Sequence, residues 1–164
     1  MTNDWGGFGI EKATFDFICN NVKHGEIFIE LGAGIVSTRE LSKLYNLYSV
    51  EQYAPFCGLY PNVNYIHAPI VNGWYDPQVL KEKLPKKSAC VFVDGPTKHG
   101  PAGSGVESRL LLKENLHLFD KNSMFIFHDT NRPEEKKLAC EIAEALGKKI
   151  VHYENGDFYS VVYP

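Results

Sequence analysis

The sequence lacks the features that define disulfide-rich, zinc-bound and membrane-spanning proteins. Its four cysteines lie far apart, and no CxxC pair or Cys/His cluster has the spacing of a zinc site. We therefore expect neither a disulfide framework nor structural zinc, and we expect a reducing, cytoplasmic compartment. No apolar run approaches the ~20 residues that a membrane helix needs, so we expect no membrane association.

An excess of charge of one sign is also missing. The 17 basic and 20 acidic residues leave a net charge of −3. Proteins that bind nucleic acid through its phosphates typically carry an excess of basic residues, so we expect no nucleic-acid partner. The start of the chain is polar and glycine-rich, so we expect no signal peptide. The remaining composition, 44% hydrophobic and 23% charged, predicts one globular domain over residues 1–164.

What the sequence does contain is a strand, a glycine turn and a helix in succession. The apolar run 27–29 indicates a buried parallel strand, and it leads into Glu30-Leu31-Gly32-Ala33-Gly34-Ile35-Val36-Ser37-Thr38. A helix is expected over about residues 38–45. Glycines let the backbone approach a ligand closely, and a helix N-terminus offers unpaired N–H groups. The pattern predicts a ligand-binding turn at Gly32 and Gly34.

The residue that leads into this turn indicates which ligand it suits. In dinucleotide-binding proteins a pyrophosphate lies on such a turn, and the carboxylate of Glu30 would repel it. Ser37 also stands where the third glycine of the dinucleotide fingerprint is expected. S-adenosylmethionine has no phosphate and carries an ammonium and a sulfonium group. Glu30 therefore favours S-adenosylmethionine over NAD.

A second acidic residue strengthens the prediction of a nucleoside site. A strand is expected over residues 47–51, and it ends in Glu51. Glu51 follows the glycine turn at close to the roughly 20-residue spacing of an acid that binds ribose. Its carboxylate can accept hydrogen bonds from both ribose hydroxyls. The alternative is a solvated loop acid, and the glycines upstream favour the ribose role.

The rest of the chain alternates between strand-like and helix-like segments. Further strands are predicted over 63–67, 89–94 and 124–128, and helices over 10–22, 77–84, 106–119 and from Pro133. The loop 95–105 is rich in glycine and proline, which is typical of functional or mobile segments. Two final strands, 150–154 and 158–163, flank Asn155-Gly156, which predicts a tight antiparallel hairpin.

These segments together resemble a small class I S-adenosylmethionine-dependent methyltransferase over nearly the whole chain. The resemblance rests on residues 30–38, Glu51, 91–96, 127–130 and the terminal hairpin. It implies a three-layer Rossmann-like α/β fold with a mostly parallel seven-stranded sheet that ends in the antiparallel hairpin. It also implies a set of cofactor-binding residues: Glu30, Gly32, Gly34, Ser37, Thr38, Glu51 and Asp94. The chain departs from related sequences in having two residues between Gly34 and Ser37, where they often have one.

A narrower resemblance is to the metal-dependent, catechol-type O-methyltransferases. In them, acids at the ends of the fourth and fifth strands hold a divalent ion. Asp94 and Asp129-Thr130 stand at the matching ends here, so the resemblance implies Mg²⁺ or another divalent cation at Asp94, Asp129 and Thr130. Neighbouring strands lie about 4.8 Å apart, and two close carboxylates repel unless a proton or cation joins them. In the alternative interpretation, Asp94 faces the methionine ammonium and Asp129 caps the next helix.

Two loop residues after Asp94 are candidates for removing a proton from a hydroxyl acceptor. Lys98 and His99 lie on the glycine-rich loop, and the catechol-type enzymes have a lysine close to the position of Lys98. Together with Asp94 they form the predicted catalytic set. The alternative is that Lys98 and His99 are solvated loop residues. His128 is open to three interpretations: a buried histidine, a base or a metal ligand.

The resulting hypothesis is methyl transfer from S-adenosylmethionine to an oxygen of a small molecule, with assistance from a divalent metal. The segments that remain to select the acceptor are the N-terminal residues, 68–77 and 95–105, unless a second subunit of a homodimer completes the site. Residues 5–9 either fold over the cofactor or form a loose terminus. Trp74 and Tyr75 either line the site or pack beneath a loop, and Arg109 either contacts an anionic acceptor or pairs on a helix surface.

Two other classes of function stay open. One is an NAD(P)-dependent oxidoreductase on a Rossmann sheet. The other is a non-catalytic protein that keeps the fold and binds the cofactor, because a fold does not by itself imply activity.

Overall fold

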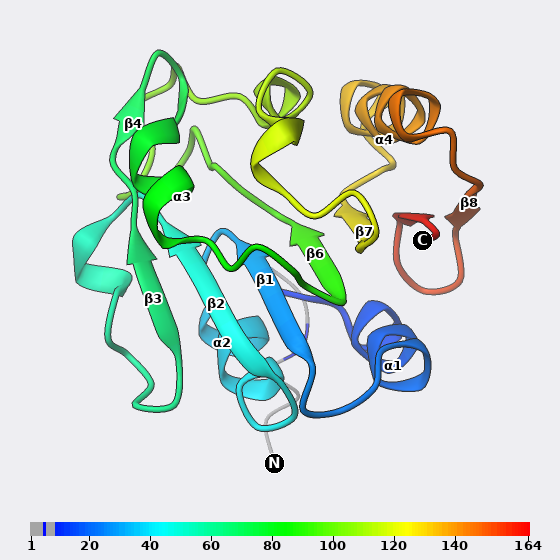
Figure 1. Ribbon diagram of the computed structural model, residues 1–164, viewed down its shortest axis with the longest axis horizontal. Coiled ribbons are helices and arrows are strands. Elements are labelled where there is room, and N and C mark those ends of the chain that lie inside the picture. The colour runs from blue at the N-terminus through cyan, green and yellow to red at the C-terminus, as the bar shows by residue number, and fades with distance from the viewer. Residues whose placement is uncertain (1–4, 6–8) are drawn as a thin grey trace.

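A seven-stranded sheet forms the centre of the computed structural model, which describes Trp5 and residues 9–164 (Figure 1). The strand order is β3-β2-β1-β6-β7-β9-β8. In chain order these strands are β1 (Ile27–Leu31), β2 (Asn46–Glu51), β3 (Asn64–His67), β6 (Cys90–Val93), β7 (Met124–His128), β8 (Ile150–Tyr153) and β9 (Tyr159–Val162). The pairs from β3 to β7 are parallel, and β9 is antiparallel to both β7 and β8.

This arrangement confirms the fold expected from the sequence. After β3 the chain crosses back to the other side of β1 and enters the sheet again at β6. Open parallel sheets bind ligands beyond the carboxyl ends of the strands at such a point of reversal. The ends of β1, β2, β6 and β7 are therefore where a ligand site is expected.

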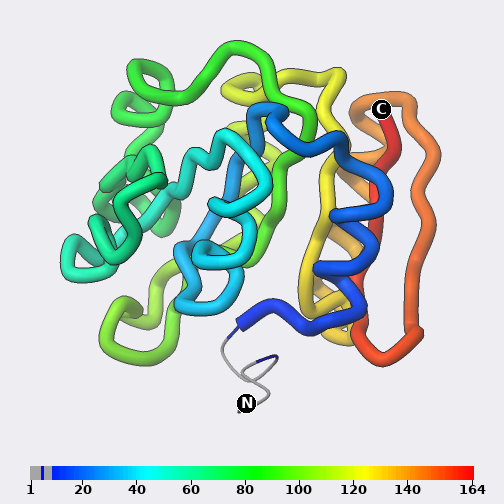
Figure 2. The backbone as a smooth tube through the Cα atoms, turned by 90° about the horizontal axis from the view of Figure 1, so that it is seen from below, coloured from blue at the N-terminus to red at the C-terminus, as the bar shows by residue number. Residues whose placement is uncertain are grey.

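Helices cover both faces of the sheet. The α-helices are α1 (Lys12–Asn21), α2 (Ile35–Leu41), α3 (Pro77–Lys83) and α4 (Pro133–Leu146), and the 3₁₀ helices are η1 (Ala54–Phe56), η2 (Arg109–Leu112) and η3 (Leu116–Leu118). The helices α1 and α2 lie along one face of the sheet, and Figure 2 shows them from below. The segments α3, η2, η3 and α4 cover the other face.

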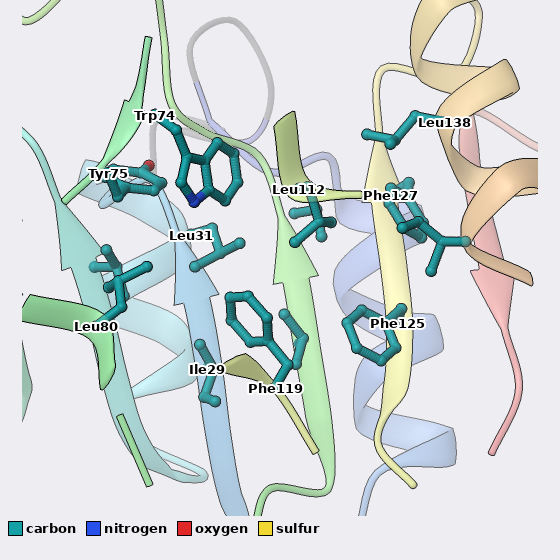
Figure 3. Packing of buried hydrophobic residues seen from close by; sticks show 14 of the residues in the cluster. Ile29, Leu31, Trp74, Tyr75, Leu80, Leu112, Phe119, Phe125, Phe127 and Leu138 are labelled. Carbon is teal, nitrogen blue, oxygen red and sulfur yellow. The ribbon is translucent and has the colours of Figure 1, made fainter. Parts of the chain in front are cut away.

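Alternation along each strand divides the core into two clusters. In β1, Ile29 and Leu31 pack toward η2, η3 and α4, and Phe28 packs toward α1 and α2 (Figure 3). In β7, Phe125 and Phe127 belong to the first cluster, while the alternate residues belong to the second. Fully burying one such side chain stabilises the fold by about 1.5–3 kcal/mol. The same alternation decides that Glu30 faces α2.

The glycine turn and the helix after it differ from the expected boundaries. The helix α2 begins at Ile35, three residues before the expected start at Thr38, and Gly34 is its N-cap in an extended conformation. The Thr38 hydroxyl accepts a hydrogen bond from the Gly34 N–H at 2.9 Å. Because this bond satisfies one of the free N–H groups of the first turn, the helix can start directly after the glycine.

The prediction of an α-helix over residues 106–119 is wrong. The segment forms only the two 3₁₀ helices η2 and η3. The Ser108 hydroxyl accepts from the Leu110 N–H, and the Asn115 side chain donates to the Leu111 carbonyl at 2.9 Å. Such side-chain bonds compete with α-helical pairing. The Ser108 N–H also donates to the Gly73 carbonyl, which ties the segment to a neighbouring hairpin.

That hairpin consists of β4 (Ile70–Val71) and β5 (Trp74–Tyr75). Its turn has positive φ angles at Asn72 and Gly73, which suit a two-residue hairpin loop. Trp74 and Tyr75 are buried in the core, so the packing interpretation of these two aromatics is confirmed.

Within the described residues, no helix has the length and apolarity needed to cross a membrane. Residues 6–8 of the glycine-rich opening segment lie outside the described residues, and the proposed folding of this segment over a cofactor is untested.

Candidate functional site

A cavity of about 620 Å³ lies over the carboxyl ends of β1, β2, β6 and β7. This volume falls in the usual range for small-molecule sites. The glycine turn lines one side, and Glu51 and Gln52 follow β2. Asp94, His128 and Asp129 reach the cavity from the ends of β6 and β7, and loop 97–102 closes part of it. Apolar side chains of Ile35, Val36, Phe56 and Leu59 contribute to its wall.

The glycines of the turn are required by close backbone contacts. Gly32 has a φ of 93°, and a Cβ there would lie 3.0 Å from the Gly95 nitrogen. A Cβ at Gly34 would lie 2.4 Å from the Ser37 hydroxyl. The loops after β1 and β6 therefore touch through the backbone at Gly32 and Gly95, and both glycines line the cavity.

Glu30 lies beneath the turn, outside the residues that line the cavity. It is fully buried, and its Oε2 accepts from the hydroxyls of Thr38 at 2.6 Å and Ser49 at 2.7 Å. Burial raises its pKa to about 7, although hydrogen bonds from these hydroxyls lower it. Since Thr38 also binds the Gly34 N–H, Glu30 holds the shape of the turn from below. Ser37 and Thr38 are likewise buried and outside the cavity lining.

Glu51 faces the cavity, as the ribose hypothesis requires. Its side chain is 4% exposed, and Oε2 accepts from the Ala33 N–H at 3.0 Å. Its Oε1 accepts from the Tyr53 N–H at 2.7 Å. Burial raises the pKa of Glu51, and the main-chain donors act in the opposite direction. Each carboxylate oxygen has about two acceptor sites, so both can accept a further hydrogen bond.

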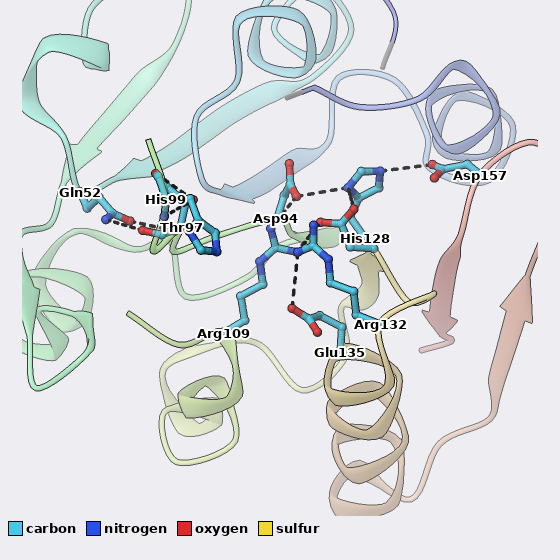
Figure 4. Close-up of polar contacts among 10 residues, drawn as sticks. Gln52, Asp94, Thr97, His99, Arg109, His128, Arg132, Glu135 and Asp157 are labelled. Atoms are coloured by element: carbon cyan, nitrogen blue, oxygen red, sulfur yellow. Dashed lines mark hydrogen bonds and ion pairs between the residues drawn. The ribbon is translucent and has the colours of Figure 1, made fainter. Parts of the chain in front are cut away.

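Gln52 joins the end of β2 to the glycine-rich loop. Its amide nitrogen donates to the carbonyls of Thr97 at 3.0 Å and Ala102 at 2.7 Å, and its oxygen accepts from the Thr97 N–H at 3.1 Å (Figure 4). It also contacts the Glu107 carboxylate at 3.3 Å. One neutral side chain therefore fixes the loop over the cavity.

The predicted convergence of Asp94 and Asp129 is confirmed. One ligand atom each of Asp94, His128 and Asp129 lies within 4.8 Å of the others. Asp129 has a φ of 59°, a left-handed conformation that aspartate adopts more readily than most residues. This turn directs the chain away from the sheet directly after β7.

Arginine side chains pair with both acids. Nη2 of Arg109 contacts Asp94 at 3.1 Å, and Nη1 contacts Asp129 at 3.2 Å. Arg132 contacts the same Asp129 oxygen at 3.1 Å from the more exposed side. Figure 4 shows Arg109 and Arg132 reaching the acids from different segments. The guanidinium of Arg109 is therefore the bridge between the two carboxylates.

His128 is buried among three carboxylates. Its Nδ1 lies 3.2 Å from Asp94 and 3.5 Å from Asp129, and its Nε2 lies 3.3 Å from Asp157 (Figure 4). Burial lowers the pKa of His128, but bonds to Asp157 and Asp94 and the surrounding negative charge outweigh burial and raise it to about 10. Asp157 is itself held by the Thr14 hydroxyl. These carboxylates favour the protonated, imidazolium form of His128.

The residues do not fit the ligand set expected for Mg²⁺. A divalent ion between Asp94 and Asp129 would have to displace the Arg109 guanidinium, and its imidazole ligand would have to lose a proton. Thr130, the third expected ligand, is buried and outside the cavity lining, and its N–H donates to the Phe158 carbonyl.

The two candidate bases lie in different places. His99 lines the large cavity. Lys98 is exposed and lines a neighbouring hollow of about 70 Å³, which His99 and Arg109 share. His99 is therefore the candidate base that faces the large cavity.

The fold is shared with solved structures that differ greatly in sequence. No protein-family model and no curated protein sequence matches the chain. The C-terminal domain of precorrin-6Y C5,15-methyltransferase from Rhodobacter capsulatus is 13% identical with a TM-score of 0.62, over 97% of this chain and 91% of that one.

Two further structures show the range of reactions on this fold. The 1,6-didemethyltoxoflavin-N1-methyltransferase from Burkholderia thailandensis, solved with S-adenosylhomocysteine, is 13% identical with a TM-score of 0.54, over 92% of this chain and 75% of that one. A spermidine synthase is 12% identical with a TM-score of 0.54, over 87% of this chain and 55% of that one. These similarities establish the Rossmann-like α/β fold, which this chain shares with two methyltransferases and a spermidine synthase.

Proposed function

We propose that this protein binds S-adenosylmethionine in the cavity and transfers its methyl group to a small-molecule acceptor. The observation that carries the proposal is the carboxylate of Glu51. It faces the cavity beside the glycine turn, with main-chain N–H groups holding both oxygens in place. A carboxylate fixed in this way is suited to accept hydrogen bonds from the two ribose hydroxyls.

Other features of the cavity fit the same cofactor. The apolar wall of Ile35, Phe56 and Leu59 offers a surface for a flat, uncharged base. Asp94 and Asp129 are paired with arginine and histidine, so Glu51, which neutral main-chain groups hold, is the cavity acid that remains to face a cationic ligand. When bound, S-adenosylmethionine supplies a methyl group already activated on sulfonium, so the protein's task is to align the acceptor and exclude water.

A small acceptor fits the cavity, whose volume of about 620 Å³ it would share with the cofactor. His99 faces this cavity and is the candidate for removing a proton from an oxygen acceptor. The Arg109 guanidinium also lines the cavity, and it can stabilise negative charge that develops on the acceptor oxygen.

The test is calorimetric binding of S-adenosylhomocysteine to the wild type and to Glu51→Gln. We expect Glu51→Gln to weaken binding by about tenfold or more, since it removes charge-assisted hydrogen bonds. Glu26→Gln is the matched control, because Glu26 is exposed and directly precedes the amino end of β1, whereas the cavity lies at the carboxyl end. We expect it to bind as the wild type does.

A parallel titration with NADH distinguishes the oxidoreductase alternative. Binding of NADH without binding of S-adenosylhomocysteine would refute the proposal. Binding of S-adenosylhomocysteine, followed by no transfer of labelled methyl groups to a panel of hydroxylated and amine acceptors, would favour the non-catalytic alternative.

A further inference from the structure

Two carboxylates at the ends of adjacent strands share one arginine. Arg109 is 12% exposed along its side chain, and it donates from one terminal nitrogen to Asp94 and from the other to Asp129 (Figure 4). We propose that Arg109 is a built-in cation that occupies the place of a divalent metal ion between Asp94 and Asp129. The site then works without such an ion.

The carboxylates beside this arginine are already paired with cationic side chains. Arg109 contacts both Asp94 and Asp129, and Arg132 contacts the same Asp129 oxygen at 3.1 Å and Glu135 at 3.8 Å. A divalent ion between Asp94 and Asp129 would place two further positive charges against these guanidinium groups, which is costly unless one of them leaves.

The backbone holds Arg109 in position from both sides. On one side, the Ser104 N–H donates to the Glu107 carboxylate at 2.8 Å, and Gln52 contacts the same carboxylate. On the other side, Ser108 is tied through its N–H to Gly73 and through its hydroxyl to Leu110. The guanidinium therefore projects from a fixed segment toward the two acids.

Removal of the arginine should reveal the site that it fills. Asp94 and Asp129 supply two oxygen donors, and His128 adds a nitrogen donor when the ion displaces its proton, all within 4.8 Å of one another. Such a donor set suits Mn²⁺ and similar first-row ions. The wild type should therefore bind no Mn²⁺ at this site, and a variant without the Arg109 side chain should gain binding.

The inference rests on the proposed function only in assuming that the methyl acceptor binds in the part of the cavity beside Arg109. Its test needs neither cofactor nor acceptor. Failure to bind S-adenosylhomocysteine would overturn the proposed function, and the Mn²⁺ result would still be decisive for Arg109.

The experiment is titration with Mn²⁺, with the free ion measured by electron paramagnetic resonance. We compare the wild type, Arg109→Ala, Arg109→Lys and the double variant Arg109→Ala with Asp129→Asn. We expect one equivalent to bind to Arg109→Ala at least about tenfold more tightly than to the wild type, because a competing cation has been removed. Arg109→Lys keeps the positive charge and should behave as the wild type, and the double variant should lose the gain.

Two results would overturn the inference. One is stoichiometric Mn²⁺ binding by the wild type that Asp94→Asn abolishes. The other is a folded Arg109→Ala protein, checked by circular dichroism, that binds no Mn²⁺. If Arg109→Ala does not fold, Arg109→Gln replaces it as the neutral variant and is judged by the same two criteria.

Discussion

The two halves of the site, in and beneath the cavity, hold their acids in different ways. On the side of β1 and β2, Glu30 and Glu51 accept hydrogen bonds from neutral groups, which are hydroxyls for one and main-chain N–H groups for the other. On the side of β6 and β7, Asp94 and Asp129 are paired with arginine and histidine. In the first half the acids are held by hydrogen bonds from neutral groups, and in the second half they are held by ion pairs.

This difference suggests a division of labour in the proposed reaction. Neutral main-chain donors fix one carboxylate without cancelling its charge, which suits recognition of a constant partner such as a cofactor. A cluster of opposite charges responds to protonation and to salt, which suits the place where a proton is lost. The halves should therefore respond to different perturbations.

The largest effect should come from breaking the glycine contact between the halves. Gly32→Ala places a methyl group against Gly95 at a positive φ, so we expect it to destabilise the protein by about 2–4 kcal/mol through steric overlap and backbone strain. Gly58→Ala is the control, because Gly58 has a similar φ and no atom within 4 Å of the added carbon. Denaturant unfolding measures both, and equal losses would show that close packing at Gly32 is unimportant.

A change in pH should separate the charged half from the neutral half. Burial lowers the pKa of His128, but its acidic partners raise it to about 10, so the folded state keeps a proton that the unfolded chain releases near pH 6.5. The stability that this proton confers is complete below about pH 6.5 and is lost as the pH rises through about 10.

We therefore expect the free energy of unfolding to fall by about 3 kcal/mol between about pH 7 and about pH 9.5 in the wild type. His128→Gln should flatten this decline, whereas His24→Gln, at an exposed position, should retain it. Parallel curves for the wild type and His128→Gln would contradict the assignment of a buried imidazolium.

The smallest effect should come from releasing the loop that Gln52 holds. Gln52→Ala removes three hydrogen bonds to Thr97 and Ala102, and we expect a loss of about 1–2 kcal/mol that is confined to the loop. Amide hydrogen exchange over residues 97–107 should become about tenfold faster. Gln78→Ala, on the exposed side of α3, serves as the control. Unchanged exchange in Gln52→Ala would show that other contacts close the loop.

The sequence was sufficient for the features that depend on local pattern. The strands of the sheet, the turn at Gly32 and Gly34, and the hairpin around Asn155-Gly156 follow from periodicity and turn residues. The meeting of Asp94 and Asp129 followed from the geometry of parallel strands. The position of Glu30 beneath the turn could also have been predicted, because Glu30 shares its face of β1 with the apolar Phe28.

The contacts that connect distant segments could not be predicted in this way. The bridge formed by Arg109 depends on the irregular backbone of η2, where the sequence pattern favours an α-helix. The partnership of His128 with Asp157 joins β7 to the turn before β9, and no local signal marks it. Gln52 resembles any loop glutamine until the loop over the cavity is in place.

The antiparallel insertion of β9 sets the order in which a growing chain can complete the sheet. The strand lies between β7 and β8, so β7 keeps one open edge until residues 159–162 have been synthesised. The five residues of β7 are buried in the finished structure, and an exposed apolar edge invites pairing with other chains. Asp157 reaches His128 in the same late step. Ribosomes that stall a few codons before this strand would therefore release chains prone to aggregation, in which the charged half of the cavity is unfinished.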